Sequence, residues 1–367
     1  MEIVPVSDGH GLDRFIAFPY HHYRDDPLWV PPLRMDVRTL LTPGKNPFFE
    51  HAAAQYFLAR ADGRTVGRIA AIKNDAHNRE HGDRVGFQGF FESVNDQGVA
   101  NALFDAAAAW LRRQRLAVLR GPMSPSINDE CGLLVDGFDT PPTLMMPHNP
   151  PYYVALHERY GFTKAKDLLA FQSTTLAMPD RIARAARLIA ERKGITLRPL
   201  NMKRFQAEVE LIKALYNQAW ERNWGFVPLT DKEIDHLAKQ LKPIVDPDLV
   251  CFAERGGTII GFAVALPDLN VALKHNPSGR LWGLPKVLWF ARRIHRLRIL
   301  LLGAVKEYRV TGVDALMYHW IWTKGVGHGY TWGEGGWILE DNTPMVNAAG
   351  QLGFHPYKTY RIYDKLL

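Results

Sequence analysis

The residues best suited to hold a phosphate group stand where a strand pattern runs into a helix pattern, late in the chain. The segment RILLLGAV is followed by KEYRVTGVDALMYHWIW, which puts Arg309, Gly312 and Asp314 at the turn that opens the helix. A tight, glycine-containing turn of this kind leaves backbone N–H groups unpaired, and together with the helix dipole they suit a pyrophosphate. We call residues 305–314 the phosphate turn and predict an anion site there.

Several carboxylates are candidates for accepting a proton from a nucleophilic group. Glu340 ends the next strand pattern and, by period-two alternation, shares a face with Glu334. Asp268 ends an earlier strand pattern, and Asp129 lies in a polar cluster of the first half. Each of them can also be read as a turn cap. Glu340 is the preferred proton acceptor, with Asp268 and Asp129 as the alternatives.

The elements that must position these residues occur twice. The patterns QYFLARADGRTVGRIAAI and LVCFAERGGTIIGFAVAL both read as hairpins, with strand formers around Asp-Gly or Gly-Gly. Each is followed by a helix pattern, a further strand and a closing segment that ends in Gly-Phe, which indicates a diverged internal repeat. We therefore predict two α/β domains, residues 1–178 and 179–367.

Length and composition agree with this division. The chain of 367 residues exceeds the roughly 250–300 at which a single core stops growing, and 47% hydrophobic with 23% charged residues is typical of globular proteins. The two cysteines, Cys131 and Cys251, form no CxxC pair, so neither a disulfide framework nor a metal site is expected. The sequence lacks a signal-peptide pattern and a spanning apolar run, so we expect a cytoplasmic protein.

The phosphate turn and the segment after it resemble GNAT acyltransferases. Arg309-x-x-Gly312-x-Asp314 is similar to their Arg/Gln-x-x-Gly-x-Gly/Ala motif, and Asn342 precedes Gly353-Phe354 by the spacing of that family. The resemblance implies two tandem GNAT domains, with mixed central sheets and flanking helices, and acyl-CoA as the co-substrate. The implied cofactor-binding residues are Ala304, Val305, Lys306, Arg309, Val310, Thr311, Gly312, Val313, Asp314 and Asn342.

Three departures from the GNAT pattern bear on the site. The corresponding helix of the first half starts near residues 95–98 without a basic residue, so CoA is expected in the second half only. Asp314 stands where glycine or alanine is usual, which places a carboxylate near a phosphate. Ala349 stands where many GNAT enzymes carry a tyrosine acid, so that proton must come from elsewhere or from water. Backbone N–H groups from Ala304 to Lys306 would hold the carbonyl oxygen.

Longer blocks resemble a narrower group. RDDPLWVPP, SPSINDECGLLVDGFDTPP, MPHNPPYY and NQAWERNWGFVPLT look like the tandem GNAT proteins that include bacterial ceramide synthases. This implies transfer of a long acyl chain to the amine of a sphingoid base, a step of sphingolipid biosynthesis. The alternatives are a soluble acetyltransferase of a small amine or peptide, and a non-catalytic acyl-CoA-binding module. Aromatic residues that would line a lipid tunnel, or pack in an ordinary core, are Trp220, Trp224, Phe226, Tyr152 and Tyr153.

The net charge of +7 has a local source. Residues 280–298, RLWGLPKVLWFARRIHRLR, hold six Lys/Arg and no acid, and Pro285 suits a helix start. We predict a basic amphipathic helix that either packs on its domain or lies on an anionic membrane, and we prefer the membrane. Nucleic acid is not expected as a partner, because no reading motif accompanies the charges. The predicted membrane residues are Trp282, Trp289, Arg292, Arg293, Arg296 and Arg298.

Overall fold

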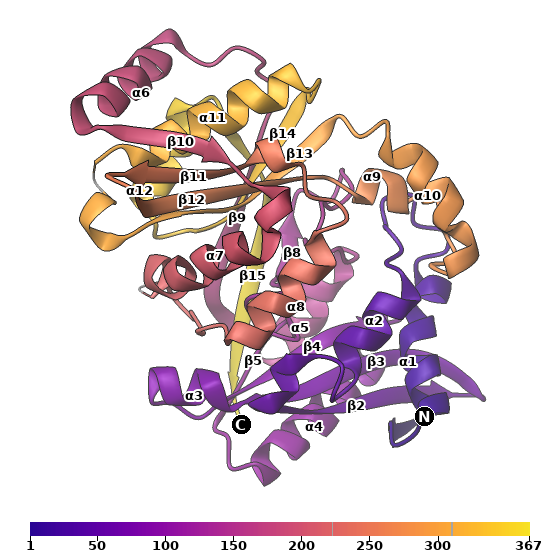
Figure 1. Cartoon of the computed structure of the whole chain (residues 1–367). Coiled ribbons are helices and arrows are strands. Elements are labelled where there is room, and N and C mark those ends of the chain that lie inside the picture. The colour runs from indigo at the N-terminus through magenta and orange to yellow at the C-terminus, as the bar shows by residue number, and fades with distance from the viewer. Residues whose placement is uncertain (222, 310) are drawn as a thin grey trace. The chain divides into compact units, whose positions relative to one another are not determined.

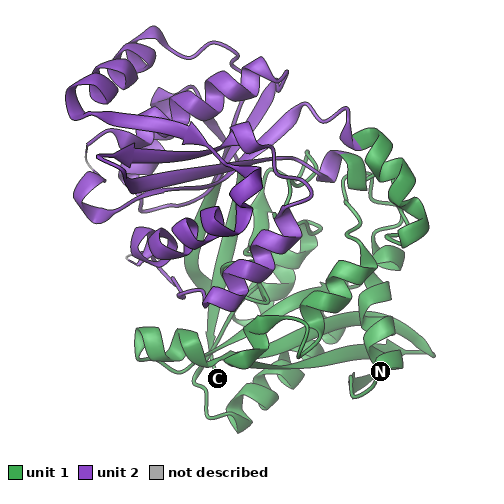
Figure 2. Ribbon diagram, viewed as in Figure 1, with its two compact units in different colours: residues 1–169, 272–290, 358–367 green, residues 170–271, 291–357 purple. Residues whose placement is uncertain are grey.

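The computed structural model describes residues 1–221, 223–309 and 311–367 (Figure 1). These divide into two compact units, coloured separately in Figure 2. Unit 1 comprises residues 1–169, 272–290 and 358–367, and unit 2 comprises residues 170–271 and 291–357.

Neither unit is one continuous piece of chain. Strand β9 (Thr163–Ser173) begins in unit 1 and ends in unit 2, whereas β15 (His355–Leu366) begins in unit 2 and ends in unit 1. The boundary near residue 178 describes the repeat in the sequence, and it stays a prediction.

Unit 1 contains a mixed sheet in which the strands follow the order β1-β2-β3-β4-β5-β15. Only β4 and β5 pair in parallel within this run; the neighbours from β1 to β4 and the pair β5–β15 are antiparallel. The strands are β1 (Glu2–Pro5), β2 (Ala52–Ala61), β3 (Arg64–Asn74), β4 (Val85–Ser93), β5 (Val118–Gly121), the pair β6 (Met123–Ser124) and β7 (Glu130–Cys131), and β8 (Leu133–Asp136) on β15.

Helices cover both faces of this sheet (Figure 1). Leu103 and Phe104 of α4 are fully buried on one face, where a Cβ on Gly67 of β3 would lie 2.8 Å from Leu103 Cδ1. Phe15 of α1 packs on the other face, beside Arg68. The helices are α1 (Gly9–His22), α2 (Arg34–Leu41), η1 (Pro47–Glu50), α3 (Asp75–His81), α4 (Gln97–Arg113) and α5 (Tyr152–Tyr160).

Unit 2 repeats the arrangement, with the strand order β9-β14-β13-β12-β11-β10. The strands from β10 to β13 pair antiparallel, and β13 and β14 pair in parallel. The strands are β10 (Ile195–Pro199), β11 (Val250–Arg255), β12 (Thr258–Pro267), β13 (Arg296–Ala304) and β14 (Trp332–Leu339). The helices are α6 (Asp180–Lys193), η2 (Met202–Arg204), α7 (Phe205–Trp220), α8 (Asp231–Leu241), η3 (Pro247–Leu249), η5 (Lys306–Tyr308), α11 (Val313–Gly327) and α12 (Thr343–Gln351).

The two predicted hairpins are present as β2–β3 and β11–β12. Their turns, Asp62-Gly63 and Gly256-Gly257, have positive φ angles at both central residues. This is the geometry of a type I′ hairpin turn, which matches the twist of the flanking strands. Within the described ranges, no helix has the length and apolar character needed to cross a membrane.

The basic segment differs from its prediction. Short helices α9 (Asn270–Leu273), η4 (Leu281–Gly283) and α10 (Leu284–Ala291) precede β13, so the segment is helical in its first part and a strand from Arg296 onward. The predicted strand RILLLGAV is present and begins two residues earlier than expected, because Leu297 and Arg298 already pair with β12. Arg298 is 3% exposed within the sheet. The prediction of membrane contact through Arg298 is therefore wrong, whereas that through the partly exposed Arg296 stays a prediction.

Candidate active site

The phosphate turn leads into α11 through Gly312, the N-cap residue of the helix. Its φ of +84° is a left-handed conformation that favours glycine, and a Cβ there would lie 2.5 Å from Ile189 Cδ1 of α6. In the described part of the chain, no side chain caps this helix end. The next N–H groups, including those of Val313 and Asp314, can therefore meet an anion.

Arg309 holds the turn against α7. Its Nη2 donates to the carbonyl oxygen of Gln218 at 2.5 Å, and its Nε donates to that of Ala304 at 3.5 Å. Gln218 lies in the last turn of α7, where a cation interacts favourably with the helix dipole. In this structure Arg309 thus positions the turn, and a phosphate would have to compete with the helix carbonyls for its guanidinium.

Other backbone groups of the turn are occupied. The N–H of Val305 donates to Ile260 O of β12 at 3.0 Å, so the prediction that Val305 offers an N–H to the carbonyl oxygen of a substrate is wrong. Thr311 donates its hydroxyl to Tyr308 O, and its own carbonyl accepts from Lys193 Nζ. Ala304 is buried at the end of β13 and Lys306 is exposed, whereas Val310 lies outside the described residues.

The carboxylates predicted from the sequence have different surroundings. Asp268 is 2% exposed, accepts from the N–H of Asn270, and has Oδ2 3.7 Å from Arg296 Nε. Asp129 belongs to unit 1 and accepts from Ser126 Oγ at 2.7 Å. Glu340 is partly exposed in the turn after β14. Asn342, two residues later, caps α12 by accepting from the N–H of Met345.

Sequence reasoning missed a buried ion pair at the centre of unit 2. Arg298 and Glu334 stand opposite each other on β13 and β14, with Nε 3.4 Å from Oε1. Glu334 is fully buried and also accepts a hydrogen bond from the hydroxyl of Tyr357. Arg298 in turn donates to Gly336 O at 3.0 Å. A buried pair needs such additional hydrogen bonds, because taking two charges out of water is costly.

This ion pair lies where the two parallel strands begin to separate. The pairs described between β13 and β14 run from Arg296–Trp332 to Ile299–Gly335, while β13 continues to Ala304 and β14 to Leu339. The pairing of β12 with β13 also skips Leu300, which forms a bulge. Bulges bend a strand and re-aim its side chains, so the bulge helps to open the sheet beside the ion pair.

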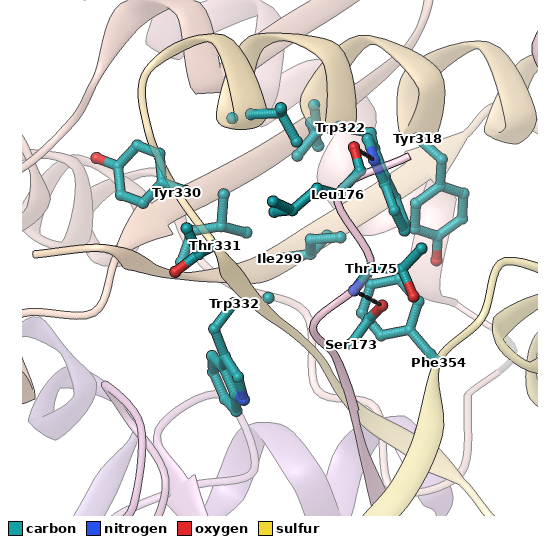
Figure 3. Close-up of a pocket in the computed structure, with 15 residues that line it drawn as sticks. Ser173, Thr175, Leu176, Ile299, Tyr318, Trp322, Tyr330, Thr331, Trp332 and Phe354 are labelled. Atoms are coloured by element: carbon teal, nitrogen blue, oxygen red, sulfur yellow. Dashed lines mark hydrogen bonds between the residues drawn. The ribbon is translucent and has the colours of Figure 1, made fainter. Parts of the chain in front are cut away.

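An open apolar pocket with a cavity volume of about 50 Å³ lies in unit 2 between α11 and the first residues of β13 and β14. In Figure 3, Leu176 and Ile299 point into its middle, with Tyr330 and Thr331 on one side and Trp322 and Phe354 on the other. Its described lining carries no charged side chain. It consists of Ser173, Thr175, Leu176, Leu297, Ile299, Tyr318, Ile321, Trp322, Gly325, Val326, Tyr330, Thr331, Trp332, Gly333 and Phe354.

Hydrogen bonds and burial keep this pocket rigid and neutral. Trp322 Nε1 donates to Leu176 O at 3.2 Å, and its ring meets Phe354 edge to face at 6.0 Å. Burial raises the pKa of Tyr330 to about 12. Burial also raises the pKa of Tyr318, and the negative charge of Asp314 raises it further. Both hydroxyls therefore stay protonated at neutral pH, and the pocket suits an alkyl chain.

The aromatic residues expected to line a tunnel have packing partners. Trp220 stacks on Tyr216, and its ring lies so close to β13 that a Cβ on Gly303 would be 2.8 Å away. Phe226 is buried and Trp224 is partly buried. None of the three is among the described residues that line the pocket, so their role in a tunnel stays a prediction.

Tyr152 and Tyr153 belong to a buried polar cluster of unit 1 that the sequence did not reveal. Glu92 accepts from the hydroxyl of Tyr153 at 2.8 Å, and burial raises the pKa of its carboxyl. Burial lowers the pKa of His22, 3.1 Å from the same hydroxyl, to about 4, so this imidazole is neutral at physiological pH. The cluster is completed by Tyr23 and Arg68.

Among the described residues, no three histidine, cysteine or acidic side chains gather closely enough to hold a metal ion.

Comparison with known proteins decides the family. A curated protein named bacterial ceramide synthase, from Caulobacter vibrioides, is 38% identical to this chain over 376 residues, spanning 100% of this chain and 98% of its own length. The chain belongs to the bacterial ceramide synthase family. Protein YghO of Escherichia coli is 37% identical over 363 residues, spanning 96% and 92% of the two lengths. No family model matches the sequence.

Solved structures confirm the predicted fold of this ceramide synthase family member. A tandem GNAT protein from the clavulanic acid biosynthesis pathway has a TM-score of 0.60 and 13% identity, over 100% of this chain and 98% of its own. A GCN5-related N-acetyltransferase from Sphaerobacter thermophilus has a TM-score of 0.55 and 12% identity, over 99% and 95%. Identities this low show the fold alone. Together with the family, they make this chain a tandem GNAT N-acyltransferase.

Proposed function

We propose that this N-acyltransferase transfers a long acyl chain from acyl-CoA to the amino group of a sphingoid base. The apolar pocket of unit 2 carries the proposal, because its described lining bears no charged side chain and therefore suits an alkyl chain. The full-length similarity to a protein named bacterial ceramide synthase supports the same substrate class.

The CoA pyrophosphate would sit at the N-terminus of α11, on the backbone of Gly312, Val313 and Asp314. Unit 1 offers no equivalent, since Asp96 already occupies the corresponding end of α4 and accepts from the N–H groups of Gly98 and Val99. A carboxylate at that position satisfies the helix end and repels a phosphate. CoA binding in the second half only therefore stays the proposal.

For the reaction, the neutral amine attacks the thioester carbonyl, a C–N bond forms and the C–S bond breaks. The amine proton passes to a carboxylate, and the CoA thiolate takes up a proton. We assign the accepting role to Glu334, because it is held on both sides by Arg298 and Tyr357 beside the opening between β13 and β14. Glu340, Asp268 and Asp129 remain the alternatives.

The direct test offers the purified protein a mixture of acyl-CoAs and a sphingoid base in detergent, followed by mass spectrometry of the lipids. We expect long-chain amides of the base. Acetylated products alone would favour the acetyltransferase of a small amine, and CoA binding without any product would favour a non-catalytic acyl-CoA-binding module.

The CoA site can be tested by thermal stabilisation. Gly312→Glu should abolish the stabilisation by CoA, worth about 2.7 kcal/mol at a concentration 100-fold above Kd, whereas Gly98→Glu in unit 1 should leave it intact. Because a side chain at Gly312 would also press on Ile189, a second variant is needed. Asp314→Asn removes a carboxylate near the pyrophosphate and should tighten CoA binding about fivefold. Weaker binding to Asp314→Asn, or equal losses from both glycine variants, would contradict this site.

We further propose that the protein contacts an anionic membrane through one face of unit 1. Trp282 and Leu288 are 70% and 66% exposed, and Leu281 and Trp289 are about half exposed. Tryptophan and leucine on a short helix can enter the headgroup region of a bilayer. Arg292 and Arg293, which follow α10 directly in the chain and are counted with unit 2, are exposed and would add to the attraction toward lipid phosphates.

A further inference from the structure

Unit 1 contains an open pocket lined mainly by arginines. It has a volume of about 300 Å³, far above the roughly 10–15 Å³ that one water needs. We call it the arginine pocket, and define it by Arg14 of α1, Arg34 and Arg38 of α2, and Arg280 before α10, with Asp13 as the acid on its rim. Figure 2 shows all these elements in unit 1.

The charges of the arginine pocket are not balanced by its own residues. Asp13 pairs with Arg38, and the three other arginines leave the lining with a net charge of +3. Burial lowers the pKa of the Arg34 guanidinium, and the charge of Arg280 lowers it further. The two guanidinium groups therefore repel each other, and an anion between them would relieve that repulsion.

Two of the arginines, Arg34 and Arg280, are positioned by contacts with the segment before α10 and with Tyr20. Arg34 Nε donates to Ser278 O at 2.9 Å, and the guanidinium stacks on the Tyr20 ring at 4.0 Å. Gly279 has a φ of +60°, and a Cβ there would lie 2.5 Å from Pro32 O. The buried Asn276 donates to Arg280 O at 2.9 Å. A positively charged pocket preorganised in this way loses little entropy when it binds an anion.

The arginine pocket also adjoins the apolar face of unit 1. Arg280 places its guanidinium over the Trp282 ring at 4.7 Å, and Leu281 and Trp282 follow it directly in the chain. Phosphate-binding groups therefore lie next to side chains suited to the headgroup region. A lipid presents the same order, with a phosphate at the surface and alkyl chains beneath it.

We propose that the arginine pocket binds the phosphate of an anionic phospholipid while Leu281 and Trp282 enter the surrounding interface. This inference rests on the membrane contact proposed above and adds a defined headgroup site to it. The guanidinium groups would clamp the phosphate oxygens with charge-assisted hydrogen bonds. The site would fix which face of unit 1 meets the bilayer.

The test is flotation of the full-length protein with vesicles of phosphatidylcholine, with or without phosphatidylglycerol. Arg14→Gln combined with Arg280→Gln should weaken binding to the anionic vesicles by more than about 30-fold, since diffuse attraction alone contributes roughly a fivefold factor for each arginine. Arg292→Gln combined with Arg293→Gln removes the same charge from exposed residues that contribute diffuse attraction only, and should cost about 30-fold at most. Equal losses from the two pairs would mean diffuse attraction and overturn the headgroup site.

Charge-conserving variants sharpen the result. Arg14→Lys combined with Arg280→Lys keeps the net charge but loses the planar fork of the guanidinium, so we expect about a fivefold loss that diffuse attraction would not produce. Unchanged binding by this pair would count against the pocket. Displacement of the protein from vesicles by inorganic phosphate at equal phosphate concentration, with thermal stabilisation by phosphate alone, would identify a site for a soluble anion and overturn the lipid proposal.

Two further measurements distinguish the headgroup site from the proposed membrane contact and from the proposed reaction. Trp282→Ala combined with Trp289→Ala should weaken binding to both vesicle types, and full binding by this pair would overturn the membrane contact and the headgroup site together. Amide formation from detergent-solubilised substrates should be unchanged in the arginine variants. Absence of amide formation in the wild type, with normal vesicle binding, would reject the proposed reaction and leave the headgroup site standing.

Discussion

Glu334→Gln should lower the turnover of amide formation about 100-fold or more, while acyl-CoA still stabilises the protein against heat. The substitution keeps the shape of the side chain and removes its ability to take a proton, and general base catalysis typically contributes about 10²- to 10⁴-fold. It also breaks the buried ion pair with Arg298, and removing one partner of such a pair costs about 3–5 kcal/mol of stability. Rates should therefore be measured well below the unfolding temperature of the variant.

Two comparisons separate lost basicity from lost stability. Arg298→Met leaves the carboxylate in place but breaks the same ion pair, so it should be equally unstable and distinctly more active than Glu334→Gln. Tyr357→Phe removes only one hydrogen bond to Glu334 and should cost less still. If Glu340→Gln abolishes turnover while Glu334→Gln does not, the proton acceptor is Glu340, the residue preferred from the sequence. The same result with Asp268→Asn would assign the role to Asp268.

Filling the apolar pocket should change which acyl-CoA is used. Val326 lines the pocket and is 38% exposed, so it lies at the rim, where an indole can replace it without entering the core. Val326→Trp should lower kcat/KM for long-chain acyl-CoA about 10- to 60-fold relative to a short-chain donor. The estimate follows from about 0.8 kcal/mol for each of two or three methylenes that no longer leave water.

A matched control for the pocket is Met202→Trp. Met202 is 37% exposed, outside the described lining, and gains the same ring. The ratio of kcat/KM for long-chain and short-chain donors should be unchanged in this variant. An unchanged ratio in Val326→Trp would mean that the acyl chain binds elsewhere, for example beside Trp220 and Phe226.

The parts of the fold that local sequence determines were predictable. The hairpin turns need positive φ angles, and Asp62-Gly63 and Gly256-Gly257 provide them. The turn into α11 could be located for a similar reason, since Gly312 adopts a left-handed conformation that few other residues tolerate. Such signals depend only on residues that are adjacent in the chain.

Pairings across the sheet could not be predicted in this way. The carboxylate of Glu334 gains its significance from Arg298, and the two meet only because β13 and β14 pair in one parallel register. In the sequence, Arg298 is the last residue of a basic run, and nothing local distinguishes an arginine with a buried partner from one in water. The same reason hides the occupied N–H of Val305, whose acceptor is on β12.

Strands β9 and β15 each begin in one unit and end in the other, and this affects the order in which the units can fold during synthesis. The sheet of unit 1 takes its last strand from the C-terminal end of the chain, where Arg120 of β5 forms two hydrogen bonds of 2.7 Å with Asp364 of β15. On the ribosome, the N-terminal part must wait for residues 358–367 before its sheet is complete. Most N-terminal domains, by contrast, have their whole sheet available before later domains are synthesised. Unit 1 can therefore be complete only once residues 358–367 have been synthesised, and unit 2 only once the chain has reached residue 357.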